Sequence, residues 1–278
     1  MRYEKLHLKD YYAFLGEDGH DPVLEIYLPY NMTEMHREHQ KRPCLVVCPG
    51  GAYYMCSQRE SEPIALQFLP EGFNVFVLTY TTAPSRFPTH IREVAAVMEL
   101  IYKYTEDWNC DTSKIAIMGF SAGGHLAAHY STMYDCKEIR EVFPESKAVN
   151  ASVLCYPVIS SDPSFGEMGS FENLLGKRPE TAEEFAYYSC EKQVDENTPP
   201  AFLWHTAEDG CVPVMNTLVY AAALAKHKVP FEVHVYPFGY HGLSTCDKTT
   251  CDAVDINVEY DSAWIPASKK WLKLILNL

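Results

Sequence analysis

Short apolar segments alternate with longer amphipathic segments along this chain, and that alternation restricts its fold more than any other feature. The short segments are rich in β-branched and aromatic residues, as strands are. Several are almost uniformly apolar, which is typical of parallel strands covered on both faces. We expect strands at 23–29, 44–50, 74–80, 114–120, 151–158, 201–207 and 231–237.

Helix-length segments separate these expected strands. Within residues 87–108, Ile91, Val94, Met98 and Ile101 recur at helical spacing. The alternation predicts an α/β fold, with a mostly parallel central sheet and helices on both faces. In such sheets, active sites gather at the carboxyl ends of the strands. Further helices are expected at 59–70, 122–134, 180–189, 214–227 and 263–277.

The chain shows no internal repeat and no low-complexity linker, so we expect a single domain over residues 1–278. Residues 157–200 are too many for a simple connection between strands, so we expect an insertion there. Their aromatic side chains either shape the pocket or pack in a helical subregion. The acidic segment 243–263 either borders the site or is a solvated loop.

The charge of the chain excludes several classes of partner. There are 37 Asp and Glu residues against 23 Lys and Arg, a formal net charge of −14 at pH 7. Nucleic acids and anionic membranes bind clustered basic side chains, so neither is an expected partner. No segment approaches the roughly 18 apolar residues of a membrane span, and the N-terminus is charged where a signal peptide is apolar. We therefore expect a cytoplasmic protein, and the sequence leaves a homo-oligomer open.

The ten cysteines are few for a disulfide scaffold of this length. Most lie in apolar runs, where a free thiol packs as a small hydrophobic side chain. Cys246 and Cys251 form the one close pair in a polar loop, without a second pair of Cys or His ligands. We therefore expect reduced cysteines, no metal site and no cofactor.

The strongest chemical signal is Gly119-Phe120-Ser121-Ala122-Gly123, which fits G-x-S-x-G between an expected strand and an expected helix. Glycines permit a sharp strand-to-helix turn that holds a serine in a strained conformation. The helix N-terminus then favours negative charge near the serine oxygen. A plain Gly/Ser turn is the alternative, but the flanking strand and helix favour Ser121 as a nucleophile.

A second loop of small residues, Pro49-Gly50-Gly51-Ala52-Tyr53, follows an earlier expected strand. It occupies the place of an HGGG-type oxyanion loop. Small residues let backbone N–H groups approach an oxyanion closely. A Gly-Gly turn alone would carry no function. Together with the downstream serine motif, however, the loop predicts that Gly51, Ala52 and also Ala122 supply the N–H groups of an oxyanion hole.

A nucleophilic serine needs an acid and a base, in the chain order Ser, then Asp or Glu, then His. Asp209 lies in the acidic turn after one late strand, and His241 in the loop after the next. His241 would take the proton from Ser121, and Asp209 would hold the imidazole tautomer. Glu208 competes for the acid but has a longer side chain. His125, in the helix after Ser121, is expected to be structural.

These motifs together resemble the α/β-hydrolase-fold esterases, and in particular the acetyl esterases and xylan esterase-like proteins. The resemblance covers nearly the whole chain: PGGAY, then YTTAP followed by Phe87-Pro88, then GFSAGGHLAA, then TPPAFLWHTAEDGCVPV, then GYHGL. The chain departs from the wider pattern at Pro49, where His is usual, and at Thr81, where Arg is frequent. The second departure affects local support beneath the active site.

The resemblance implies an α/β-hydrolase fold and a serine carboxylic ester hydrolase that removes short acyl groups through an acyl-enzyme. It also implies that residues 157–200 form a small cap insertion beside the active site. Acetyl is the expected acyl group, and small soluble esters such as acetylated xylo-oligosaccharides are the expected substrates. Tyr53, Tyr54 and Trp204 are candidate faces for a sugar ring, and each fits core packing equally well.

Two alternatives stay open. An arylformamidase or a peptidase-like amide hydrolase resembles this architecture. Arylformamidases, however, keep a His-Gly-Gly loop, and prolyl-oligopeptidase-type enzymes carry a propeller domain for which 278 residues leave no room. A non-catalytic binding protein on a hydrolase fold is the alternative of another class. Such proteins typically lose the serine or the histidine, whereas Ser121, Asp209 and His241 are all present.

Overall fold

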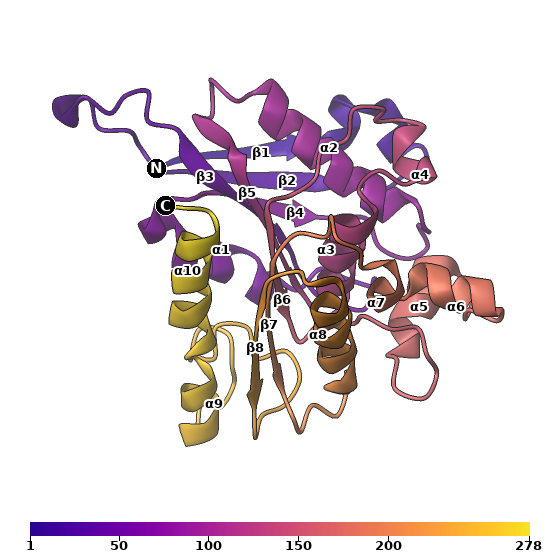
Figure 1. Ribbon diagram of the computed structural model, residues 1–278. Helices are drawn as coiled ribbons and strands as arrows, with labels where there is room; N and C mark the ends of the chain where they lie inside the picture. The colour runs from indigo at the N-terminus through magenta and orange to yellow at the C-terminus, as the bar shows by residue number, and fades with distance from the viewer.

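One sheet organises the chain in the computed structural model, which describes residues 1–278. Its strands are β1 (Arg2–His7), β2 (Val23–Leu28), β3 (Arg42–Cys48), β4 (Asn74–Thr79), β5 (Cys110–Phe120), β6 (Ala151–Cys155), β7 (Ala201–Thr206) and β8 (Phe231–Tyr236). Their order in the sheet is β1-β2-β4-β3-β5-β6-β7-β8 (Figure 1). β2 is antiparallel to β1 and β4, and every other pair of neighbours is parallel. The expected mostly parallel sheet is confirmed.

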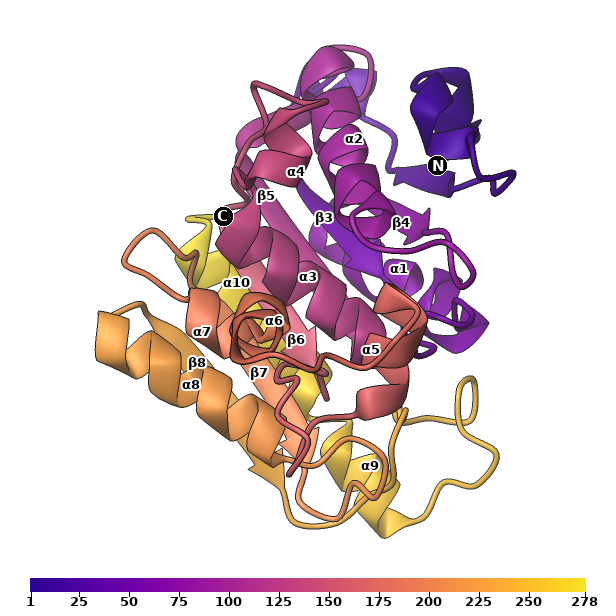
Figure 2. The same ribbon diagram turned by 90° about the vertical axis from the view of Figure 1, so that its right-hand side faces the viewer.

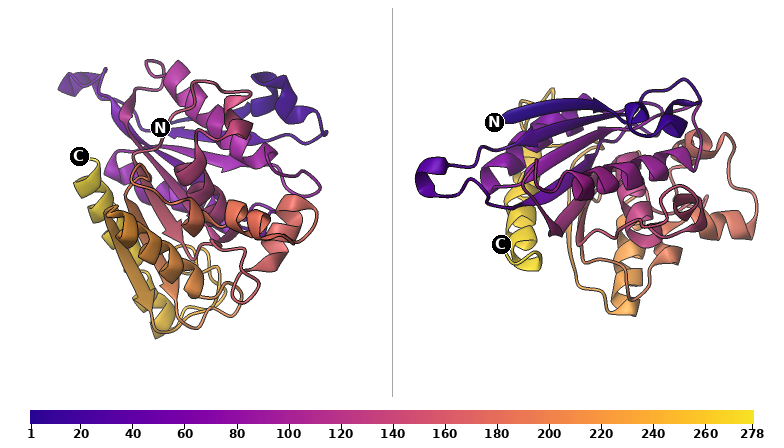
Figure 3. Two further views of the ribbon diagram at one scale, coloured as in Figure 1. Left: turned by 45° about the vertical axis from the view of Figure 1, so that its right-hand side comes forward. Right: turned by 90° about the horizontal axis from the view of Figure 1, so that it is seen from above.

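β1 is absent from the predicted strands because its sequence, RYEKLH, has no apolar run. It lies at the edge of the sheet and pairs with β2 alone, from Arg2 opposite Leu28 to His7 opposite Val23. Figure 3 shows it in indigo along that edge. Charged side chains are common on edge strands, which they protect from pairing with other chains. The pattern of a buried strand therefore could not reveal it.

Helices cover both faces of the sheet (Figures 1 and 2). They are α1 (Glu62–Phe68), α2 (Thr89–Lys103), α3 (Ser121–Met133), α4 (Lys137–Arg140), α5 (Met168–Leu175), α6 (Ala182–Tyr188), α7 (Cys190–Gln193), α8 (Met215–His227), α9 (Ile256–Asp261) and α10 (Trp264–Ile275). α2, α3 and α8 pack on one face and α1 and α10 on the other, each face with its own buried apolar cluster. Val46 and Val47 of β3 belong to opposite clusters, which explains the uniformly apolar strands. No helix has the length and apolar character needed to cross a membrane.

The insertion between β6 and β7 carries α5, α6 and α7, which lie to one side of the sheet (Figure 1). Backbone hydrogen bonds anchor it at two places. The Phe87 N–H donates to the Leu174 carbonyl oxygen at 2.8 Å, and the Val158 N–H donates to the Ser121 carbonyl oxygen at 3.0 Å. The described helices agree with a helical subregion, and the role of residues 157–200 as a cap stays a prediction.

Glu93 on α2 is fully buried and holds the segment that follows β4. Thr81 donates to its carboxyl group twice, from N–H to Oε2 at 3.0 Å and from Oγ1 to Oε1 at 2.7 Å. This pair supplies local support at the position where arginine is frequent in the resembling proteins. Burial raises the pKa of Glu93 to about 8, even though the hydrogen bonds from Thr81 favour the carboxylate.

We expect Glu93→Gln to keep both contacts with Thr81 and to stabilise the fold at alkaline pH. Because the pKa of Glu93 is higher in the folded than in the unfolded chain, stability falls as pH rises from about 4.5 toward 8. The loss is on the order of 1.4 kcal/mol for each unit of pKa shift. An amide does not titrate, so melting temperatures of variant and wild type should diverge across this range. Parallel curves would contradict the prediction.

Candidate active site

Ser121 lies at the turn where β5 ends and α3 begins. Its φ is 53°, in the left-handed region that serine rarely adopts. Gly123 permits the turn to pack closely, because a Cβ there would lie 2.1 Å from the Cys48 carbonyl oxygen and 2.2 Å from that of Pro49. The first turn of α3 therefore rests on the end of β3, and Ser121 stands at the helix N-terminus.

His241 connects Ser121 to Asp209. Its Nε2 lies 2.8 Å from Ser121 Oγ, and its Nδ1 lies 2.7 Å from Asp209 Oδ2. The three residues follow β5, β7 and β8, so the carboxyl ends of these strands bring them together. Glu208, the competing acid, is exposed and makes no hydrogen bond with His241.

The protein holds Asp209 as a carboxylate. Its side chain is fully buried, and Oδ1 accepts hydrogen bonds from the N–H groups of Cys211 and Val212, both at 2.9 Å. Burial favours the neutral acid, but hydrogen bonds with His205 and His241 outweigh it and lower the pKa of Asp209. An ionised Asp209 accepts from Nδ1–H of His241. Nε2 is then left unprotonated, as an acceptor for the serine proton.

The loop that was expected to supply the oxyanion hole lies beside Ser121. Gly51 and Ala52 line the same pocket as the serine, and neither of their N–H groups donates a hydrogen bond within the chain. Ala122 lies in the first turn of α3, where N–H groups have no helical partner. The Ala52 carbonyl oxygen, by contrast, accepts from Asn173 Nδ2 at 2.8 Å. The insertion thus contacts this loop directly.

The pocket around Ser121 has a volume of about 380 Å³. Apolar atoms make up most of its exposed lining, although only four of the twelve lining residues are hydrophobic. Arg59 and Glu167 contribute charged side chains to its walls, and Tyr54 and Met55 are exposed beside them.

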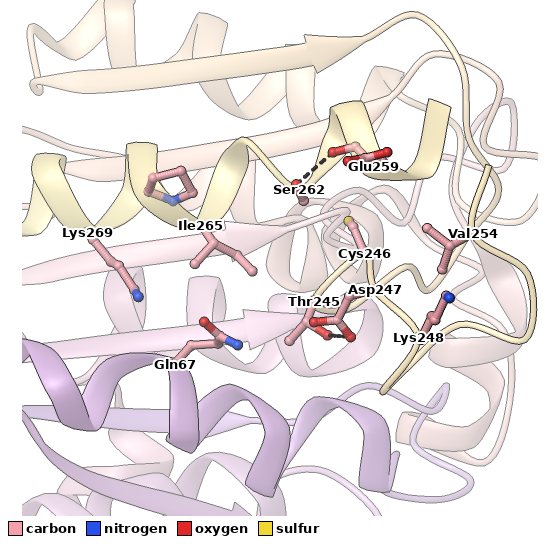
Figure 4. Close-up of a pocket in the computed structure, with 11 residues that line it drawn as sticks. Gln67, Thr245, Cys246, Asp247, Lys248, Val254, Glu259, Ser262, Ile265 and Lys269 are labelled. Atoms are coloured by element: carbon pink, nitrogen blue, oxygen red, sulfur yellow. Dashed lines mark hydrogen bonds between the residues drawn. The ribbon is translucent and has the colours of Figure 1, made fainter. Parts of the chain in front are cut away.

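A larger depression, of about 620 Å³, lies between α1, α10 and the loop after β8. Figure 4 shows its side chains, among them Gln67, Asp247 and Lys269. None of the three residues joined through His241 belongs to it. No group of three or more His, Cys, Asp or Glu side chains is arranged to hold a metal ion.

Two of the aromatic residues proposed to face a sugar ring are placed elsewhere. Tyr53 is 1% exposed and Trp204 is fully buried, stacked on Trp264 at 5.1 Å between ring centroids. Neither offers a face to a substrate, and the prediction for these two is wrong. Tyr54 is 71% exposed and lines the pocket, so it alone stays a candidate.

His125 has the structural role that was expected. Its Nε2 donates to the Tyr188 carbonyl oxygen at 2.9 Å, so its Nδ1 accepts from the Tyr53 hydroxyl at 2.8 Å. Burial lowers the pKa of His125 to about 4, which keeps the ring neutral. The pair explains why Tyr53 points into the core.

Sequence reasoning missed Glu60, a buried residue that lines the pocket, and Tyr156, which contacts both Glu60 and His241. Glu60 falls at the start of an expected helix, where an acidic residue is ordinarily exposed, and Tyr156 falls in an expected strand, where a tyrosine ordinarily packs. Nothing in the local sequence distinguishes these two from such residues. Their roles depend on contacts between distant segments.

The sheet order and the strained serine between β5 and α3 define an α/β-hydrolase. Within that class, the chain belongs to the BD-FAE family, whose model matches residues 24–224. The resemblance drawn from the motifs is thereby confirmed at the level of fold and family.

Relatives with known names agree with this assignment. The chain is 37% identical over 246 residues to endo-1,4-beta-xylanase B of Butyrivibrio fibrisolvens, a match that covers 86% of this chain and 36% of that protein. It is 31% identical over 233 residues to acetylxylan esterase of Xylanibacter ruminicola, which covers 82% and 45%. The chain therefore spans less than half the length of these two relatives.

Solved structures match over the whole chain. The acetyl ester-xyloside bifunctional hydrolase of Caldicellulosiruptor lactoaceticus aligns with a TM-score of 0.84 at 33% identity. The alignment covers 98% of this chain and 96% of that one. Similarity of this extent supports the fold from the N-terminal strand to the last helix.

Ser121→Ala should remove the nucleophile and leave the fold intact. Because a nucleophile and its base act as one unit, we expect a fall in turnover on the order of 10⁶-fold, the size of the effect in a hydrolase of another fold. Hydrolysis of p-nitrophenyl acetate measures the loss, and circular dichroism checks the fold. A folded variant with near-wild-type turnover would refute the assignment of Ser121.

In Asp209→Asn, the amide NH2 group can donate to His241 Nδ1, which favours the imidazole tautomer with its proton on Nε2. That tautomer cannot accept the proton of Ser121. We expect kcat to fall by roughly 10⁴-fold, as in the serine-protease analogue. Glu208→Gln is the matched control, since Glu208 is the exposed neighbour. A crippled Glu208→Gln beside an active Asp209→Asn would show that the acid is misassigned.

Proposed function

We propose that this protein is a serine carboxylic ester hydrolase that removes short acyl groups, chiefly acetyl, from soluble sugars such as xylo-oligosaccharides. Ser121, His241 and Asp209 are the catalytic residues. The observation that carries the proposal is the position of His241, within hydrogen-bond distance of Ser121 Oγ on one side and Asp209 Oδ2 on the other. This arrangement meets the geometric requirement for an activated serine.

Acylation begins when Ser121 Oγ attacks the carbonyl carbon of the ester. His241 Nε2 takes the serine proton, and the Asp209 carboxylate stabilises the imidazolium that forms. The carbonyl oxygen becomes an oxyanion, to which the N–H groups of Gly51, Ala52 and Ala122 donate. Collapse of the intermediate breaks the bond to the alcohol, which leaves with the proton from His241. The serine is left acylated.

Deacylation repeats the steps with water as the nucleophile. His241 Nε2 takes a proton from water as its oxygen attacks the acyl carbon, and the same N–H groups stabilise the second oxyanion. Ser121 Oγ leaves with the proton from His241, and the carboxylic acid is released. Apart from the attacking water, both half-reactions use only side chains and backbone groups of this chain, so the proposed mechanism requires no metal ion.

Two observations support a sugar ester as the substrate. The pocket is small, and its walls include Arg59 and Glu167, which can hydrogen-bond hydroxyl groups, with Tyr54 exposed beside them. The named relatives include an acetylxylan esterase, a xylanase and an acetyl ester-xyloside hydrolase. An acetyl group on a xylose ring combines a small acyl chain with a hydroxyl-rich alcohol.

A panel of esters tests the proposal. We expect kcat/KM to be highest for p-nitrophenyl acetate and to fall as the acyl chain lengthens to octanoyl, and we expect acetate release from acetylated xylo-oligosaccharides. Preference for octanoyl esters with no acetate released would defeat the substrate assignment. An aminoacyl anilide and N-formylkynurenine serve as controls, since activity on either in place of the esters would indicate an amide hydrolase. Inactivity on every substrate would indicate a binding protein.

A further inference from the structure

A buried carboxyl group, that of Glu60, lies beneath the active site outside the Ser121–His241–Asp209 set. Glu60 is 3% exposed and ends the short 3₁₀ helix Gln58–Glu60. Its Oε2 accepts from the Gly50 N–H at 2.7 Å, and its Oε1 accepts from the Tyr156 hydroxyl at 2.6 Å. Gly50 directly precedes the oxyanion loop residues, so Glu60 holds one end of that loop.

The hydrogen-bond directions at Tyr156 are determined by its second partner. The Ser244 N–H donates to the Tyr156 hydroxyl oxygen at 2.9 Å, so the hydroxyl proton is directed to Glu60. Both oxygens of Glu60 therefore accept, as a carboxylate does. Burial raises the pKa of Glu60, while the hydrogen bonds from Tyr156 and Gly50 favour its ionised form.

Tyr156 extends this network to the catalytic histidine. Its ring meets the His241 ring edge to face, with 5.1 Å between centroids and 70° between planes. Ser244 lies three residues after His241, and its Oγ donates to the Arg59 carbonyl oxygen at 2.6 Å. The indole Nε1 of Trp264 donates to the Ser244 carbonyl oxygen at 3.0 Å. The histidine loop is thus fastened to the same turn that carries Glu60.

Gly50 transmits the position of Glu60 to the nucleophile. A Cβ at Gly50 would lie 2.7 Å from Glu60 Oε2, 2.8 Å from the Phe120 carbonyl oxygen and 2.9 Å from Ser121 Cβ. The backbone at Gly50 therefore fills the space between the carboxylate and the serine. A shift of Gly50 would move the next N–H group, that of Gly51, relative to Ser121.

We propose that Glu60 is a positioning residue, which aligns the oxyanion loop through Gly50 and the His241 ring through Tyr156. The inference rests on the proposed function, because it assigns Glu60 to the reaction of that same site. Glu60 does not touch the reacting atoms. It acts by holding the N–H donors of the oxyanion loop and the His241 ring in the correct position relative to Ser121.

Glu60→Gln tests the proposal with little change of shape. An amide offers one acceptor oxygen, so it can accept from Gly50 or from Tyr156 but not from both. We expect kcat for p-nitrophenyl acetate to fall by about 10- to 100-fold, the range that one unpaired buried polar group implies, with KM within about threefold of wild type. Glu62→Gln, on the exposed first turn of α1, is the matched control and should keep wild-type kcat.

Tyr156→Phe removes the same contact from the other side and keeps the test decisive if Glu60→Gln does not fold. It should lower kcat in the same way, and the double variant should lose less than the product of the two single effects. A folded Glu60→Gln or Tyr156→Phe protein with wild-type kcat, or with a change confined to KM, would overturn the proposal.

Phosphonylation of Ser121 by a fluorophosphonate separates this inference from the proposed function. The reaction needs an activated serine and aligned N–H donors but no sugar or acetyl specificity. We expect slower labelling of Glu60→Gln than of wild type or Glu62→Gln. A wild type that is labelled but hydrolyses no ester would defeat the proposed function and leave the role of Glu60 standing. Equal labelling rates in all three proteins would defeat the role of Glu60.

Discussion

Close backbone contact between α3 and β3 is the constraint on which the rest of the site depends. At Gly123 the first turn of the helix lies against the carbonyl oxygens of Cys48 and Pro49, where no side chain fits. The contact fixes Ser121, the proposed nucleophile, and the start of the proposed oxyanion loop to the same central strands. Ser121 can then keep its positive φ, because strain of this kind persists only where the surroundings over-determine it.

The oxyanion loop is held residue by residue from three different directions. Gly50 is bound by Glu60, the Ala52 carbonyl by Asn173, and the Tyr53 hydroxyl by His125. The N–H groups of Gly51 and Ala52 are left without acceptors between these anchors. Donors fixed before the substrate arrives need no reorganisation when the oxyanion forms. The buried polar contacts therefore keep the free donors in place.

The sequence allowed prediction of whatever depends on local pattern and chain order. Ser121, Asp209 and His241 follow strands in the order their chemistry requires, and all three meet in the structure. β1 escaped prediction because an edge strand needs no apolar run. Tyr53 was misplaced because its neighbours in the loop are exposed while its own hydroxyl finds His125, which comes from α3. Contacts between distant segments produce no periodic pattern in the local sequence, so the sequence does not predict them.

One buried carboxyl group, that of Asp209, contacts His241 directly, and another, that of Glu60, reaches it through Tyr156; their surroundings give them different roles. Burial alone would raise the pKa of Asp209, but its hydrogen bonds with His205 and His241 outweigh burial and lower it. Glu60 accepts from Tyr156 and Gly50, which are neutral, and burial raises its pKa. A buried carboxylate that lost either neutral donor would be costly. Gly50 belongs to the loop that Glu60 aligns, and Tyr156 packs on the His241 ring, so the donors that stabilise Glu60 are also the groups through which it acts.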